Sequence, residues 1–180
     1  YIVYILLILF FLLSISPITS GDSISYHMGF AKYILKNGSF SKDLFFPEAP
    51  LAGAGEFLNA FALSLKAYQF TSLINFVGII SIIGILKKFS KEQKLSIDNQ
   101  NFLYLCIISC PILVFFVSSS KSQLFSISLI FFSYALLIVC LTSNQNKKFL
   151  IKTLYLLIIF PIVAVQTKIS FSLSLFLIVS

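Results

Sequence analysis

The sequence predicts an all-α, polytopic transmembrane protein. Of its 180 residues, 58% are hydrophobic and 11% are charged, and the mean hydropathy is +1.00. A typical soluble domain has about 45–50% apolar and about 25% charged residues. The composition therefore excludes an ordinary soluble domain and also a disordered chain. Several apolar runs also approach the roughly 20 residues that an α-helix needs to cross a bilayer.

Six apolar segments are expected to span the membrane, and polar linkers separate them. Their ranges are 1–16, 68–86, 102–117, 124–141, 149–165 and 169–180, of which the last is incomplete. The second segment would make a helix of about 28 Å at about 1.5 Å per residue, which is enough to cross the hydrocarbon core. The first lacks the basic start and the cleavage site of a secretory signal. Because residues 1 and 180 both lie in apolar runs, we expect the N-terminal part of one longer transmembrane module.

Residues 17–67 contain the longest polar-containing stretch and are expected to form the first external loop. Residues 25–36 predict an amphipathic helix, since Tyr26, Phe30 and Ile34 recur at helical spacing on one side. A second short helix is expected over residues 56–66. Both are too short or too polar to cross the bilayer, so we expect them to lie along the membrane surface.

The distribution of lysines predicts the orientation. The net charge is +7, and two short linkers carry most of the basic residues that lie between spans: Lys87, Lys88, Lys91 and Lys94 in one, and Lys147, Lys148 and Lys152 in the other. Lysine-rich linkers mark the cytoplasmic side of a membrane, so the charge indicates topology rather than nucleic-acid binding. By parity, the 17–67 loop and the turns around Lys121 and Lys168 lie on the external face.

The predicted external loop gathers acidic residues. Four of the six carboxylates in the chain lie there: Asp22, Asp43, Glu48 and Glu56. Asp22 follows the first span directly and can act as a general base if a substrate hydroxyl reaches it, or it can cap a helix. His27 can bind a phosphate or relay a proton, or it is an ordinary interfacial histidine. Lys121 and Lys168 are site candidates on the same face, or they are lysines whose side chains snorkel to the interface and need no partner.

The loop resembles the first external loop of the GT-C membrane glycosyltransferases, among them the protein mannosyltransferases and the lipid A aminoarabinose transferase. In that family an acidic motif follows the first span, a tyrosine and a surface helix come next, and an aromatic-Glu-x-Pro segment precedes the following helix. Six residues match in order and approximate spacing: Asp22, Tyr26, Gly38, Glu48, Pro50 and Leu51. The turn at Thr167-Lys168 also resembles a lysine-containing turn of the bacterial members.

The resemblance implies a fold, an activity and a set of site residues. The fold would be GT-C-like. The activity would be transfer of a sugar from a polyprenyl-phosphate donor to a lipid, glycan or protein acceptor, on the external face of the bacterial inner membrane. Asp22 would be the general base, and a divalent metal held by Asp22 and Glu48 is a possible cofactor. The substrate-binding residues would be Tyr26, His27, Glu48, Glu56, Lys121 and Lys168.

Two other function classes remain as alternatives. The first is a polytopic transporter or flippase of a lipid-linked substrate, and the second is a structural subunit of a membrane complex. Transporters place ionisable residues or broken helices near the bilayer midplane. In this sequence the charges cluster at the ends of the expected spans, which favours the enzyme.

Overall fold

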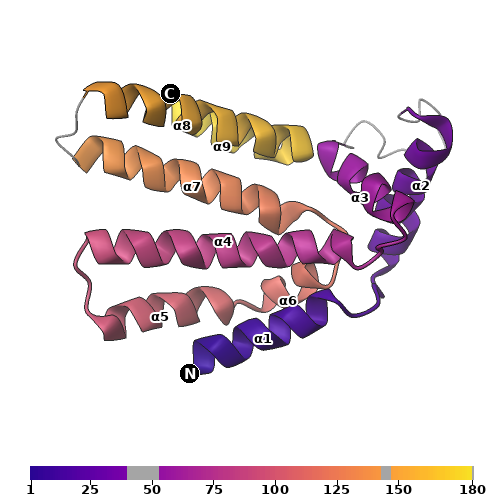
Figure 1. The fold of residues 1–180 in the computed structure, drawn as a ribbon, viewed down its shortest axis with the longest axis horizontal. Helices are drawn as coiled ribbons and strands as arrows, with labels where there is room; N and C mark the ends of the chain where they lie inside the picture. Colours follow the sequence, from indigo (N-terminus) through magenta and orange to yellow (C-terminus); the bar gives the residue numbers. More distant parts are fainter. Residues whose placement is uncertain (40–52, 143–146, 180) are drawn as a thin grey trace.

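The computed structural model describes residues 1–39, 53–142 and 147–179, and every regular element in these ranges is a helix (Figure 1). This confirms the predicted all-α fold class. The elements are α1 (Ile2–Ser14), η1 (Ser23–His27), α2 (Met28–Asn37), α3 (Ala54–Ser64), α4 (Phe70–Glu92), α5 (Ile97–Ile108), α6 (Pro111–Val117), α7 (Gln123–Thr142), α8 (Lys147–Thr167), η3 (Ile169–Phe171) and α9 (Ser172–Val179).

Helix α4 lies in the middle of the bundle and packs against α1, α5, α6 and α7, while α7 also packs against α8 (Figure 1). The apolar core at this junction takes side chains from α1, α4, α5, α6 and α7: Phe10, Ile79, Ile108, Leu113 and Leu124 are all buried there. The two short helices α2 and α3 pack against each other at one end of the bundle. We call this end, formed by residues 17–39, 53–69, 118–122 and 166–169, the loop end.

Among the described residues, two helical stretches are long and apolar enough to cross a membrane, Phe70–Glu92 and Gln123–Leu141. The pair α5 and α6 would make a third if it is one span. Three further apolar helices are shorter: Ile2–Ser14, Ile151–Thr167 and Ile169–Ile178. A membrane protein is therefore supported by length and composition, and the count of six spans stays a prediction.

The third expected span, residues 102–117, is not one continuous helix. Its two parts, α5 and α6, meet at an angle of 60°. Pro111 occupies the first turn of α6, where its missing N–H is not needed. A proline also disfavours the helical conformation of the residue before it, and Cys110 is indeed extended, with φ −66° and ψ 117°. The proline thus starts a new helix instead of continuing the old one.

The first loop helix begins earlier than its apolar pattern predicts. The chain is helical from residue 21 to residue 37, with a π-helical turn over Ser23–His27. The Ser20 hydroxyl accepts a hydrogen bond from the Ser23 N–H at 3.3 Å, so Ser20 takes the capping position for which Asp22 was a candidate. Gly38 ends the helix in the left-handed conformation, at φ 68°.

The amphipathic pattern of this helix is confirmed, because its apolar face packs on α3. Phe30 and Ile34 are buried against Ala60 and Leu63, while Lys32 is exposed. Helix α3 begins and ends two residues before the expected range of 56–66.

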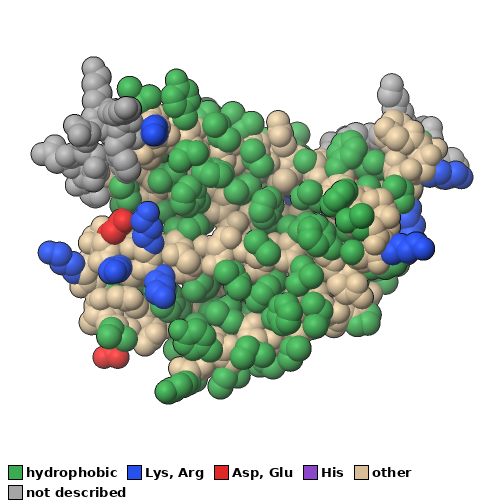
Figure 2. All heavy atoms as spheres, viewed as in Figure 1, with side chains coloured by type: hydrophobic (Ala, Val, Ile, Leu, Met, Phe, Trp, Pro, Cys, Tyr) green, Lys and Arg blue, Asp and Glu red, His purple; other side chains and the backbone are tan. Residues whose placement is uncertain are grey.

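Charge is distributed toward the ends of the molecule. Figure 2 shows lysines at two opposite ends, with a mostly hydrophobic surface between them. Lys87, Lys88, Lys91 and Lys94 are exposed where α4 ends, away from the loop end. The lysine-rich linker after α4 therefore lies at the end opposite the first loop, as the order of the expected spans predicts, and which end is cytoplasmic stays a prediction.

Candidate functional site

Three segments far apart in the sequence meet at the loop end: the first loop, the turn between α6 and α7, and the turn between α8 and η3 (Figure 1). A cavity of about 90 Å³ lies between them. It is lined by Tyr26, His27, Glu56, Lys121, Ser122, Thr167 and Lys168. The fold thus brings together five of the seven residues that the sequence suggests as a site. Their chemical roles stay predictions.

Two of the suggested residues do not line this cavity. Asp22 lies at its edge, joined to it through Lys121. Glu48 lies outside the described residues, as do Asp43, Pro50 and Leu51. Of the suggested metal pair, Asp22 is therefore described and Glu48 is not. Within residues 1–39, 53–142 and 147–179, no three His, Cys, Asp or Glu side chains gather as a metal site would require.

His27 and Glu56 form a buried pair. The Nδ1 atom of His27 lies 2.9 Å from Oε1 of Glu56, and each side chain is only 8% exposed. The other carboxylate oxygen, Oε2, accepts a hydrogen bond from the Gly53 N–H at 2.8 Å. Because a carboxylate accepts, the proton of this contact lies on Nδ1, and the Nε2 atom is left as the nitrogen that can exchange a proton or meet a ligand.

Asp22 and Lys121 form an ion pair at the cavity edge. Nζ of Lys121 lies 3.0 Å from Oδ2 of Asp22 and 5.1 Å from the centre of the Phe115 ring. The lysine side chain is 16% exposed, whereas that of Asp22 is 73% exposed. The hydrogen bond from Lys121, and then its positive charge, lower the pKa of Asp22 below its usual value. Asp22 is therefore an ionised carboxylate at neutral pH.

Lys168 adds a second positive charge to the cavity. It follows the last turn of α8 and is half-buried. In the part of the chain that the structure describes, its ammonium forms no ion pair. Burial lowers the pKa of Lys168, and the nearby charge of Lys121 lowers it further, while Glu56 acts in the opposite direction. Among the described residues, the Lys168 ammonium of this cavity thus has no carboxylate partner.

Asn75 holds the turn that presents Lys121. The two hydrogens of its side-chain Nδ2 are shared among the carbonyl oxygens of Phe116, Ser119 and Lys121, which lie 3.0, 3.1 and 2.6 Å away. Its Oδ1 accepts from the Leu124 N–H at 3.2 Å. Asn75 is completely buried in α4. One side chain therefore satisfies the carboxyl end of α6 and the start of α7.

The same turn is tied to the first loop. Nδ2 of Asn59 in α3 donates to the Ser120 carbonyl at 2.9 Å. The Ser120 N–H donates to the Ser23 hydroxyl at 3.2 Å, and the Ser120 hydroxyl donates to the Ser23 carbonyl at 3.3 Å. These bonds join the π-helical turn and α3 to the turn that carries Lys121.

Sequence reasoning missed these positioning residues. A signal was present for Asn75, since an amide inside an apolar span is costly unless it is satisfied, and such residues are usually structural or functional. Asn59 and Ser23 lie in the polar loop, where a polar side chain is ordinary, so nothing in the sequence distinguished them.

Glycines bring the start of α3 close to the cavity turns. A Cβ on Gly53 would lie 2.4 Å from the Gln166 carbonyl oxygen, and a Cβ on Gly55 would lie 2.2 Å from the Ser122 hydroxyl. Real Cβ atoms do not come so close. At Gly53 the neighbour is backbone, so only glycine allows this approach, whereas at Gly55 the Ser122 side chain would have to turn away. Thr167 also hydrogen-bonds the Ser126 hydroxyl, which fixes the end of α8 against α7.

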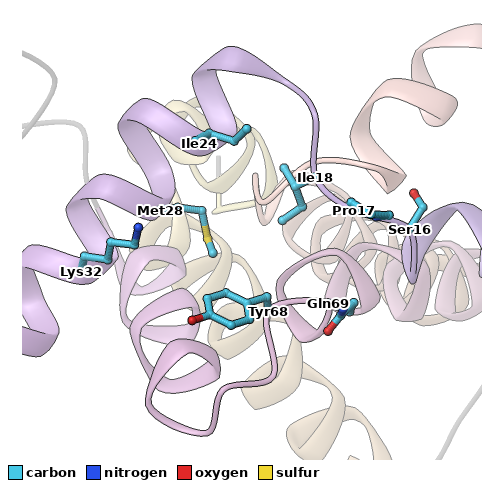
Figure 3. Close-up of a pocket in the computed structure, with 8 residues that line it drawn as sticks. All are labelled: Ser16, Pro17, Ile18, Ile24, Met28, Lys32, Tyr68 and Gln69. Atoms are coloured by element: carbon cyan, nitrogen blue, oxygen red, sulfur yellow. The ribbon is translucent and has the colours of Figure 1, made fainter.

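A larger cavity of about 280 Å³ lies on another side of the first loop helix (Figure 3). Its walls come from the segment after α1, from η1 and α2, and from the residues before α4: Ser16, Pro17, Ile18, Ile24, Met28, Lys32, Tyr68 and Gln69. Met28 and Tyr68 point toward each other across it (Figure 3). None of the residues suggested by the sequence lines this cavity.

Comparison with known proteins assigns the chain to a family. No curated protein and no solved structure matches the chain. The sequence profile of the DUF1420 N-terminal domain matches residues 1–180. Because that match covers the whole chain, the protein described here belongs to the DUF1420 family through its N-terminal domain.

Proposed function

We propose that this chain is part of a GT-C-type membrane glycosyltransferase that transfers a sugar from a polyprenyl phosphate to an acceptor. The observation that carries the proposal is the meeting of Asp22, Lys121 and Lys168 at one end of the helical bundle. An ionised carboxylate paired with one of two ammonium groups that line the same cavity supplies what transfer from a phosphate-linked sugar needs, namely a base and a site for the leaving phosphate.

In the proposed reaction, the acceptor hydroxyl attacks the anomeric carbon while the bond from that carbon to the phosphate oxygen breaks. Asp22 takes the hydroxyl proton, which becomes acidic as the new bond forms. The Lys121 hydrogen bond keeps Asp22 ionised and orients it. An ammonium group has three N–H donors, so Lys121 can hold Asp22 and a phosphate oxygen at the same time.

Lys168 would supply the second charge on the leaving phosphate. It lines the same cavity and has no carboxylate partner among the described residues. A half-buried ammonium interacts with an anion more strongly than an exposed one, because less water screens it. Tyr26, His27 and Glu56 would contact the sugar or the phosphate, and Glu48 remains the proposed second carboxylate and metal partner of Asp22.

The proposed location is the bacterial plasma membrane, with the loop end on the external side. The lysines at the opposite end of the bundle support that orientation. The partners would be the bilayer, a polyprenyl-phosphate-linked sugar, and a lipid, glycan or protein acceptor.

The test is a transfer assay with the full-length protein in proteoliposomes. Polyprenyl phosphates carrying a set of radiolabelled sugars are supplied with membrane extract as the source of acceptors. We expect label to move from the lipid phosphate to an acceptor. If the protein instead moves intact labelled lipid across the bilayer, without breaking the sugar–phosphate bond, it is a flippase and the proposal is wrong.

A further inference from the structure

The buried pair of His27 and Glu56 has no part in proton removal by Asp22, yet it faces the same cavity as the two lysines. Both residues are 6% exposed. Burying an imidazole and a carboxylate costs free energy unless they are paired and hydrogen-bonded. Here both carboxylate oxygens of Glu56 are used, one on His27 and one on Gly53.

The pairing of His27 with Glu56 leaves one ring nitrogen of His27 for proton transfer. Glu56 engages Nδ1 of His27, so Nε2 is the ring atom that is left to donate or accept a proton. The Gly53 N–H fixes the carboxylate in turn, and the close approach of Gly53 to Gln166 leaves that backbone little room to shift. Glu56 therefore acts as a positioning residue for the imidazole, as carboxylates do for histidines in other proton-transfer sites.

The charges around His27 favour an anion of phosphate type. Glu56 and Tyr26 contact the imidazole ring directly, with the ring centres of Tyr26 and His27 4.5 Å apart. Lys121 and Lys168 line the same cavity from the two turns, and Asp22 lies at its edge. Of the two ammonium groups only that of Lys121 has a carboxylate partner in the described residues, so the cavity carries positive charge available to a ligand.

Resting on the proposed transfer reaction, we propose that His27, positioned by Glu56, protonates the departing lipid phosphate and forms with Lys121 and Lys168 a site for a phosphate monoester. When the bond from the anomeric carbon to the phosphate oxygen breaks, its electron pair stays on that oxygen. The His27 Nε2 proton moves to the phosphate, which leaves as a hydrogen phosphate monoester, and His27 becomes neutral. Asp22 releases the acceptor proton to water and His27 takes one up, so the net change is one proton moved from acceptor to product.

The protonation is matched to a monoester in particular. A phosphate monoester has a second pKa of about 6, so its dianion can accept a proton from an imidazolium near neutral pH. The donor is a phosphodiester with one permanent negative charge. It has no second ionisable oxygen that could take up a proton near neutral pH. The arrangement therefore predicts that the product binds together with one proton.

The test measures binding without turnover. The full-length protein in nanodiscs is titrated calorimetrically with a ten-carbon isoprenyl phosphate monoester between pH 6.5 and 8.5. The wild-type Kd is expected to rise about tenfold for each pH unit above 7, because one proton is bound with the ligand. In His27→Asn, an amide replaces Nδ1 and keeps a donor to Glu56 but does not titrate, so the pH dependence of Kd should disappear. Lys32→Gln, exposed on the same helix, is the control and should retain it.

Several outcomes would overturn the inference. A His27→Asn protein that keeps the wild-type slope shows that another group takes up the proton. Absence of monoester binding to the wild type rules out the site. Inorganic phosphate bound as tightly as the isoprenyl monoester shows that the ligand is not a lipid phosphate. Failure of transfer with intact proton-linked binding would instead count against the proposed function alone, so the two failures are distinguishable.

Discussion

The ammonium of Lys121 lies 3.0 Å from the carboxylate of Asp22, although 99 positions separate the two residues in the chain. The contact joins the first loop to the turn between α6 and α7. Both segments belong to the end of the bundle that parity of the spans predicts to be external. The turn between α6 and α7, which returns the chain through the bundle, therefore also carries the lysine that orients the Asp22 carboxylate.

Replacing Lys121 should change the ionisation of Asp22. In Lys121→Gln the hydrogen bond from the ammonium and its charge are lost, so the pKa of Asp22 should rise toward the ordinary value of an aspartate. Carboxyl ¹³C chemical shifts of labelled aspartate, followed between pH 2 and 6, measure this. Lys66→Gln is the matched control, because it removes another lysine of the loop end, one that is exposed. An unchanged titration of Asp22 in Lys121→Gln would show that the ion pair does not form.

Lys168 should contribute to binding at the expense of stability. Its pKa is lowered in the folded protein, so the unfolded chain binds more protons at pH values between the lowered pKa and 10.5. The penalty for the charged form is thus fully present at neutral pH and disappears as pH rises toward 10.5. We expect Lys168→Gln to keep or raise Tm at pH 7 while it weakens binding of the isoprenyl phosphate at least about tenfold.

The control for that experiment is Lys152→Gln, since Lys152 is an exposed lysine near the opposite end of the same helix. Both thermal unfolding and calorimetric binding should be unchanged there. A fall in Tm together with unchanged phosphate affinity in Lys168→Gln would mean that this lysine is structural.

Two glycines of α4 should respond in opposite ways to alanine. A Cβ on Gly78 would lie 2.5 Å from the Leu124 carbonyl group, whereas a Cβ on Gly84 would meet nothing within 4 Å. Gly78→Ala must push α4 from α7 and should lower the free energy of unfolding by about 1–3 kcal/mol. Gly84→Ala should leave it unchanged or raise it by about 0.5–1 kcal/mol. Denaturant titration in detergent micelles compares them, and equal stability of the two variants would contradict this packing.

Asn75 should be more important to stability than its single side chain suggests. Asn75→Ala leaves the Ser119 carbonyl and the Leu124 N–H without their partner, while the Phe116 and Lys121 carbonyls still accept from the Ser119 and Gln123 N–H groups. The loss should cost about 1–3 kcal/mol. Asn75→Asp keeps the size but places carboxylate oxygens against those carbonyls, so we expect it to be worse. Ser81→Ala in the same helix removes only a bond to its own helix and is the control. Similar unfolding curves for Ser81→Ala and Asn75→Ala would show that the turn is held by other contacts.

The orientation can be tested with single cysteines in a background where Cys106, Cys110 and Cys140 are serine. Lys36 is exposed at the loop end, and Lys88 is exposed at the other end of the bundle. A membrane-impermeant maleimide added to intact cells should label Lys36→Cys and not Lys88→Cys, and inverted vesicles should show the reverse. The opposite pattern would place the loop end in the cytoplasm.

Several features were predictable from the sequence because they depend on local composition. Apolar runs indicate helices, and lysine-rich linkers with span parity put the Lys121 and Lys168 turns at the same end as the loop. The apolar face of residues 25–36 packs as its spacing predicts, with Phe30 and Ile34 buried.

Other features depend on contacts between distant segments, which no local pattern contains. Asn75 and Asn59 are positioning residues only because the turn at 118–122 folds over them. From the sequence, His27 resembles an ordinary interfacial histidine. Its partner Glu56 lies 29 positions away in the chain and reaches it only because α3 packs there. The π-helical turn over Ser23–His27 likewise bonds a distant segment, since Ser23 is hydrogen-bonded to Ser120.

The central claim is that Asp22 is the base of a sugar transfer, and the initial rate of transfer with Asp22→Asn tests it most directly. The matched control is Asp98→Asn, which removes an exposed carboxylate from the opposite end of the bundle. The account predicts a loss of about 10²–10⁴-fold in kcat for Asp22→Asn and none for Asp98→Asn, with equal Tm values and equal phosphate binding. Wild-type kcat in a folded Asp22→Asn protein would contradict the account.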